Sequence, residues 1–235
     1  MHPRPAQSGF SLVELAIVLV VLGLLTGGIL SGQALIRAAE LRAVPTEYSR
    51  WVTATRTFQD KYFGIPGDFR DATRFWGRQN ANADCVTNSG AAVSANGACD
   101  GNGDGSPVWE NSGGAGSVRE MHQYWRHLAL AGLVEGSFTG VSAGTGNSAT
   151  VAPGTNSPLS RAGGSSGWGA GGNNCGFSTQ CFYGPTHPIY RFYLTFGNGG
   201  VTGNLPMASA LTAEEAWNID TKIDDGMPAT GSLVD

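Results

Sequence analysis

A short run of oxygen-bearing residues separated by glycine lies near the middle of the chain. Residues 100–106 read Asp-Gly-Asn-Gly-Asp-Gly-Ser, which matches the opening D-x-N-x-D-G of a calcium-binding loop. In such a loop, alternate side-chain oxygens converge on one hard cation and glycine allows the sharp turn. The full pattern has Glu at the twelfth position, where this chain has Asn111. We therefore predict calcium, with a plain Asp/Asn/Gly turn as the alternative. The predicted ligands are Asp100, Asn102, Asp104 and Glu110.

Four cysteines have the chemistry to form disulfides or to bind zinc. They are Cys85, Cys99, Cys175 and Cys181. In a segment outside the cytoplasm, an even number of cysteines favours disulfides. Four cysteines would form two, for which three pairings exist. We favour Cys85 with Cys99 and Cys175 with Cys181, because each pair closes a short loop bounded by glycine and asparagine. Zinc is the alternative, but none of the spacings is C-x-x-C.

Two short motifs known from enzymes occur in this chain, and its high glycine content is enough to produce both by chance. Residues 163–167 fit G-x-S-x-G and residues 167–172 fit G-x-G-x-x-G. Neither follows a predicted strand or opens a predicted helix, which is the context that catalysis or phosphate binding requires. His122 and His127 are five residues apart, so they do not share a helical face and are poor metal ligands. The sequence predicts no catalytic residues.

Composition excludes several classes of protein. The 235 residues suit one domain, or one domain with an appendage. Only 14% are charged, against about 25% in an average soluble chain, and 36 are glycine, so a long solvent-facing coiled coil is excluded. A net charge of −4 argues against nucleic-acid binding through bulk positive charge. The chain is also too polar for a multi-pass membrane protein, so we expect at most one membrane segment.

That segment is the uncharged apolar run at residues 15–36. As an α-helix, these 22 residues are about 33 Å long, against about 30 Å of bilayer hydrocarbon. Arg4 precedes the run and no acidic residue comes before Glu14, which places residues 1–9 in the cytoplasm and the chain after Arg37 outside it. A removable secretory signal is the alternative, but its apolar core usually has only 7 to 15 residues.

Glu14 lies at the start of this apolar run, where an ionisable group is costly and normally has a function. Residues 11–14 match the S-x-x-E capping box that begins a helix. The longer segment at residues 9–15, Gly-Phe-Ser-Leu-Val-Glu-Leu, leads into the apolar run. It closely resembles the prepilin processing motif of type IV pilins and type II secretion pseudopilins.

The resemblance implies a processing reaction and a mode of assembly. In that family a membrane aspartyl peptidase cuts after the glycine, here Gly9, and methylates the new amino terminus, here Phe10. The acid, here Glu14, guides assembly, because its carboxylate can neutralise the Phe10 amine of a neighbouring subunit inside an apolar filament core. The implied partners are other pilin or pseudopilin subunits, a prepilin peptidase and an inner-membrane assembly platform. Nucleic acid is not expected as a partner.

The resemblance also implies a function and a location. It points to a structural filament subunit of a pilus or a secretion pseudopilus, not an enzyme. A single-pass inner-membrane precursor would become part of a periplasmic or cell-surface filament. Two alternatives stay open: a minor tip pilin that acts as an adhesin or DNA-uptake module, and a membrane-anchored periplasmic enzyme.

The expected fold class is α+β and pilin-like, with a long N-terminal helix packed on a small antiparallel-sheet head that has long loops. The second half of the helix carries one apolar stripe at steps of three and four, although Pro45 is expected to kink or break it. The stripe consists of Leu41, Val44, Tyr48, Trp51, Phe58 and Tyr62, with polar Thr55 between. The expected segments are a leader at 1–9, an assembly helix at 10–36, its amphipathic continuation at 37–63 and a head at 64–235.

Within the head, local signals predict three short helices, a strand and a loop. Asp68 with Asp71 is expected to cap the first helix, and S-x-x-E or T-x-x-E boxes are expected to begin the other two. Those boxes are Ser117 to Glu120 and Thr212 to Glu215. Residues 189–196, rich in aromatic and branched side chains, predict the strand. Residues 136–174 contain 11 glycines and one charge, which predicts a loop without a substantial core.

Overall fold

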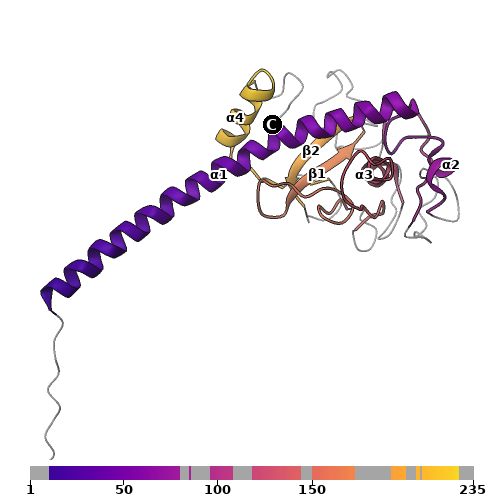
Figure 1. Cartoon of the computed structure of the whole chain (residues 1–235). Coiled ribbons are helices and arrows are strands. Elements are labelled where there is room, and N and C mark those ends of the chain that lie inside the picture. Colours follow the sequence, from indigo (N-terminus) through magenta and orange to yellow (C-terminus); the bar gives the residue numbers. More distant parts are fainter. Residues whose placement is uncertain are drawn as a thin grey trace, which may run out of the picture. The chain divides into compact units, whose positions relative to one another are not determined.

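The computed structural model of the chain describes residues 11–79, 85, 96–107, 118–143, 150–172, 192–199, 205–206 and 208–227. The elements within them are α1 (Leu12–Tyr62), α2 (Ala72–Trp76), α3 (Glu120–Leu130), β1 (Ser166–Gly171), β2 (Tyr193–Asn198) and α4 (Ala213–Ile223) (Figure 1). The chain divides into two compact units, Met1–Glu40 and Leu41–Asp235. The α+β layout with a long N-terminal helix and a small antiparallel sheet is as predicted.

The part of α1 in the second unit buries the predicted apolar stripe. Val44, Trp51 and Phe58 are buried, and Leu41 and Tyr48 pack against the same core. The helix continues through Pro45, so the predicted break does not occur. One missing backbone hydrogen bond is offset by burial of the stripe on both sides of the proline.

Helix α3 forms the centre of the second unit, and nine of its eleven residues are buried. Trp125 packs edge-to-face on Trp51 of α1, with ring centroids 5.2 Å apart. The hydroxyl groups of Tyr124 and Thr55 form a buried hydrogen bond. Buried polar side chains generally need hydrogen-bond partners inside the protein, and Gln123 and Arg126 of α3 have them. Both donate to backbone carbonyl groups of the flanking loops.

The two strands pair in antiparallel fashion, with Trp168 opposite Phe196 and their ring centroids 5.1 Å apart. All six residues of β1 are buried, although this strand lies in the glycine-rich stretch 136–174. The expectation that this stretch lacks a substantial core is therefore wrong. Glycine is the reason, because a Cβ at Gly169 would lie 2.6 Å from Thr195 and from Pro206. Small residues let the covering chain approach the strand closely.

Of the three predicted side-chain caps, one forms and two do not. Thr212 and Glu215 form the predicted capping box of α4. Helix α3 begins at Glu120, after Arg119 and without a side-chain cap, so Glu120 is not the third residue of the predicted box. Its carboxylate instead accepts a 2.8 Å hydrogen bond from the Asn102 amide. Helix α2 follows Asp71, also without a side-chain cap, and Asp68 has a different role described below.

Candidate functional site

The N-terminal end of α1 is a helix cap built from Ser11 and Glu14. The Ser11 amide donates to Glu14 Oε2 at 2.8 Å, and the Val13 amide donates to Ser11 Oγ at 3.3 Å. These contacts satisfy amide groups that would otherwise lack partners at a helix start. Glu14 is exposed, and within the described part of the chain only the Ser11 amide reaches its carboxylate. One carboxylate oxygen therefore completes the cap, and none of the hydrogen bonds described for this part of the chain uses the other.

Behind this cap, α1 presents apolar side chains on every side. Each residue from Leu12 to Leu30 is exposed within the chain, including Leu19 at 68% and Leu24 at 73%. Among the described residues, α1 is the one helix long and apolar enough to cross a membrane. Such a surface is unfavourable in water, because each large apolar side chain gains roughly 1.5 to 3 kcal/mol on burial. Lipid or protein must cover it.

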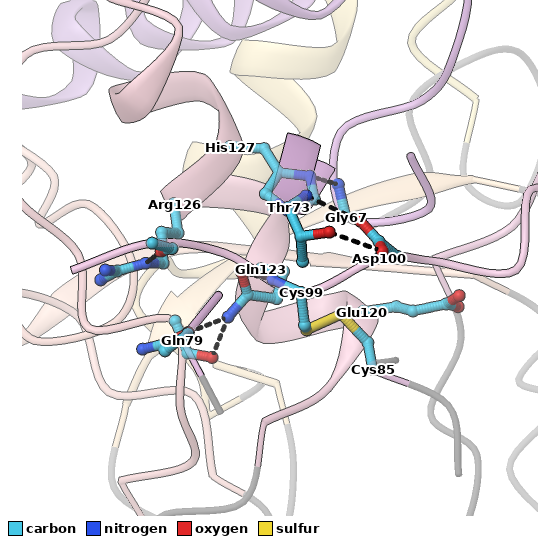
Figure 2. The surroundings of a disulfide bond; sticks show 12 residues. Gly67, Thr73, Gln79, Cys85, Cys99, Asp100, Glu120, Gln123, Arg126 and His127 are labelled. Atoms are coloured by element: carbon cyan, nitrogen blue, oxygen red, sulfur yellow. Dashed lines mark hydrogen bonds between the residues drawn. A yellow bond between two sulfur atoms is a disulfide. The ribbon is translucent and has the colours of Figure 1, made fainter. Parts of the chain in front are cut away.

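The disulfide Cys85–Cys99 lies under the start of α3 (Figure 2). The two Cα atoms are 5.3 Å apart, within the usual range for a disulfide. Both sulfur-bearing residues are buried beside Val118, and the Cys85 amide donates to the Asp100 carbonyl oxygen at 2.9 Å. The bridge thereby ties residue 85 to the start of the loop at residues 100–106.

The first acidic residue of that loop binds α2. Asp100 accepts two hydrogen bonds from Thr73, at 2.7 Å from the backbone amide and 2.8 Å from the hydroxyl (Figure 2). Asp104 accepts from the Ser106 amide and from the Asn102 side-chain amide, at 2.9 and 3.1 Å. These acids act as acceptors for nearby protein donors.

A third carboxylate, Asp68, enters the same loop from the segment after α1. It accepts hydrogen bonds from the Gly103 amide at 2.5 Å and the Gly105 amide at 2.7 Å, and it is only 2% exposed. Burial raises the pKa of Asp68, while these amide hydrogen bonds oppose the shift. Asp68 is thus an acceptor for the loop backbone and not the predicted helix cap.

These contacts bear directly on the calcium prediction. Ca²⁺ takes six to eight oxygen ligands at about 2.3 to 2.6 Å. A calcium ion at Asp100, Asn102 and Asp104 would have to replace the hydrogen bonds that their side chains make in this structure. Glu110 lies outside the described residues. Calcium binding at this loop stays a prediction.

Two fully buried histidines lie on α3. His127 Nδ1 accepts a 2.9 Å hydrogen bond from the Gly67 amide, which requires that nitrogen to be unprotonated (Figure 2). Gly67 has φ of +86°, and a Cβ there would overlap the Glu120 carbonyl oxygen, so glycine is required for this approach. Burial lowers the pKa of both His122 and His127 to about 3, helped by the charges of Arg119 and Arg126 respectively. Both are neutral structural residues at pH 7.

The comparisons with known proteins concern the N-terminal site. Residues 4–30 match the family model of the prokaryotic N-terminal methylation motif. The chain carries the N-terminal signature of type IV pilin and pseudopilin precursors. No curated protein and no solved structure matches the chain. The signature covers most of the leader and the start of α1 and does not reach the head at residues 64–235.

The pilin signature and α1 together fit a membrane-anchored precursor. The signature points to a structural subunit instead of an enzyme, and it implies other pilin subunits and a prepilin peptidase as partners in general. Gly9 and Phe10, where cleavage and methylation are predicted, lie outside the described residues, as do Cys175 and Cys181. Glu14 is the one residue of the predicted N-terminal site whose contacts are described.

A partly buried carboxylate contact that the sequence did not predict fixes the glycine-rich segment to α1. Glu47 accepts hydrogen bonds from Ser160 Oγ at 2.7 Å, the Arg161 amide at 2.9 Å and Trp168 Nε1 at 2.7 Å. Nothing near Glu47 in the sequence indicates this role. Its three partners lie more than 110 positions away.

Proposed function

We propose that the chain is a structural subunit of a type IV pilus-like or type II secretion pseudopilus filament. The observation that supports this function is the methylation motif at residues 4–30, which leads directly into the exposed apolar surface of α1. In this proposal a prepilin peptidase removes residues 1–9 and methylates Phe10. The mature chain then polymerises through its N-terminal helix.

The apolar surface gives the proposed assembly its driving force. Before assembly the surface lies in the lipid of the inner membrane, where it is stable. In a periplasmic or cell-surface filament the same side chains pack against the helices of neighbouring subunits. Both environments exclude water, so one helix serves first as membrane anchor and then as filament core.

Glu14 supplies the specificity that a uniform apolar surface lacks. Its Oε2 accepts from Ser11 of its own chain, and the second oxygen is available to the Phe10 amine of a neighbour. In an apolar core an ion pair offsets the cost of burying each charge, whereas one unpaired charge is strongly unfavourable. The pair would therefore select the register in which Glu14 of one subunit meets the amine of another.

Substitution of Glu14 tests this role. Glu14→Ala removes both the cap and the charge, whereas Glu14→Gln keeps a cap acceptor and removes the charge. If the carboxylate acts in assembly, both variants insert in the membrane but form at least about tenfold fewer filaments than the native chain, equivalent to about 1.4 kcal/mol. Glu40→Gln, which loses only the 3.2 Å ion pair with Arg37, is the matched control. A normal filament yield from Glu14→Gln would show that Glu14 acts only as a helix cap.

A further inference from the structure

The surface at the end of α1 and along α2 combines exposed aromatic rings with basic side chains. Phe63 is 94% exposed and Phe75 is 58% exposed. The Lys61 ammonium lies 5.1 Å from the centroid of the Tyr62 ring, which lies 5.3 Å from that of Phe75. Arg74 is the exposed neighbour of Phe75 on α2. We call Lys61, Phe63, Arg74 and Phe75 the α2 surface.

Charge and backbone geometry both set this surface apart. Between residues 56 and 78, five basic side chains are exposed against two acidic ones. These are Arg56, Lys61, Arg70, Arg74 and Arg78 against Asp60 and Asp71. Phe63 has φ of +55° and is the one non-glycine residue with positive φ in the described part of the chain. Such a conformation costs energy in a residue with a large side chain, and here it holds an aromatic ring in the solvent.

A second surface, on α4, has the opposite charge. Trp217 is 50% exposed and Met227 is 59% exposed, and Trp217 Nε1 donates to the Gly226 carbonyl oxygen at 3.1 Å. Glu214 lies three residues before Trp217 and is therefore its neighbour on the helix. Asp225 lies just after the end of α4, next to Gly226, and is exposed. We call Glu214, Trp217, Asp225 and Met227 the α4 surface.

Negative charge is concentrated around the α4 surface. Residues 212–227 contain five acidic side chains, of which Asp220 alone is buried, and one basic side chain, Lys222. Carboxylate oxygens of Asp220, Asp224 and Asp225 lie within 4.8 Å of one another. Opposite net charges on two surfaces steer association and set its orientation, while the exposed aromatic rings supply apolar area at the centre of a contact.

The two surfaces lie at opposite ends of the second unit (Figure 1). From this placement and the opposite charges, we infer that the α2 surface of one copy binds the α4 surface of the next copy. A contact between two different surfaces is heterologous, so each added subunit presents a new binding surface and the assembly stays open. The inference rests on the proposed filament function and names a contact between heads that adds to the contact between N-terminal helices.

Photo-crosslinking in the full chain tests where the α2 surface binds. Benzoylphenylalanine replaces Phe75 in chains produced with a prepilin peptidase and an assembly platform, and the cross-linked peptides are identified by mass spectrometry. The expected product joins residue 75 to a peptide within residues 212–227 of a second copy. Cross-links only to other regions of the chain would contradict the inference. Cross-links only to nucleic acid, identified by their loss on nuclease treatment, would contradict it too.

Charge reversal tests the electrostatic part of the contact. Arg74→Glu and Glu214→Arg are each expected to lower the cross-link yield about tenfold, and the double variant is expected to restore it. Arg161→Glu, an exposed arginine outside both surfaces, is the matched control and should leave the yield unchanged. Failure of the double variant to recover, with each single variant folded, would overturn the pairing. If filaments form without this cross-link, only the head contact is contradicted. If the chain is never cleaved after Gly9, the filament function itself is contradicted.

Discussion

Trp168 Nε1 of β1 donates a 2.7 Å hydrogen bond to Glu47 Oε2 of α1, across 121 positions of sequence. The same carboxylate accepts from Ser160 Oγ and from the Arg161 amide. One residue of the long helix thus holds both the turn before β1 and the strand itself. The ring of Tyr48, the next residue of α1, stacks on that of Trp168, with ring centroids 6.5 Å apart.

We predict that Glu47→Ala lowers the free energy of unfolding by about 2 to 4 kcal/mol, because three donors lose a charged acceptor. Urea unfolding of the full chain in detergent, followed by tryptophan fluorescence, measures the change. Glu135→Ala is the control, since that side chain is 92% exposed and its 3.5 Å ion pair with Arg50 is worth at most about 1 kcal/mol. Equal effects of the two substitutions would contradict the structural role of Glu47.

The buried histidines predict a loss of stability in acid. The pKa of His122 and His127 is about 3 in the folded chain, against 6.5 ordinarily, so the unfolded chain binds more protons between these values. Stability therefore rises with pH from about 3 to 6.5, by at most about 1.4 kcal/mol per pH unit for each histidine. Unfolding curves at pH 4.5, 5.5 and 7 measure this slope.

The control for this slope is a chain without the two titrating groups. His127→Asn keeps an acceptor for the Gly67 amide, and His122→Phe keeps an aromatic ring where described residues offer no hydrogen-bond partner to either ring nitrogen. The double variant is expected to depend much less on pH across this range. An unchanged slope would mean that other groups cause the acid sensitivity.

Asp68 is predicted to hold the loop at residues 100–106 in place. Asp68→Ala leaves the Gly103 and Gly105 amides without their acceptor, which should lower the free energy of unfolding by about 1 to 3 kcal/mol. Asp71→Ala removes an exposed carboxylate that caps nothing, and its effect should stay within about 0.5 kcal/mol. Thermal unfolding of both variants in detergent decides whether the loop depends on Asp68.

Calcium binding at the same loop is tested by comparing thermal unfolding in calcium and in a chelator. If Asp100, Asn102 and Asp104 bind the ion, calcium at 100 times its dissociation constant adds about 2.7 kcal/mol and raises the melting temperature. Asp104→Ala should then abolish the difference. Identical melting of the native chain in both conditions would show that hydrogen bonds alone close the loop.

The features that could be predicted from sequence are those set by neighbouring residues. The stripe from Leu41 to Tyr62 has a helical period, and Thr212 and Glu215 satisfy each other within one turn. The Cys85–Cys99 pair closes a loop of only 14 positions. In each case the physical partners are close in the chain, so their spacing is informative.

The features that could not be predicted depend on distant partners. Asp68 resembles a helix cap locally, but the Gly103 and Gly105 amides, 35 and 37 positions away, bind its carboxylate. The glycines of β1 resemble a loop locally, yet Leu205 and Pro206 lie close enough that added side chains would overlap them. Local propensity describes the alternatives open to a segment, and tertiary contacts select among them.

The mass and N-terminal sequence of the mature chain test the filament-subunit proposal most directly. The full chain would be produced with a prepilin peptidase, extracted from membranes and analysed by intact-mass spectrometry and N-terminal peptide sequencing. The predicted result is a chain that begins at Phe10, lacks residues 1–9 and carries one methyl group on its amino terminus. A chain that keeps Met1, or one that begins near Ala34 after cleavage as a secretory signal, would contradict the proposal.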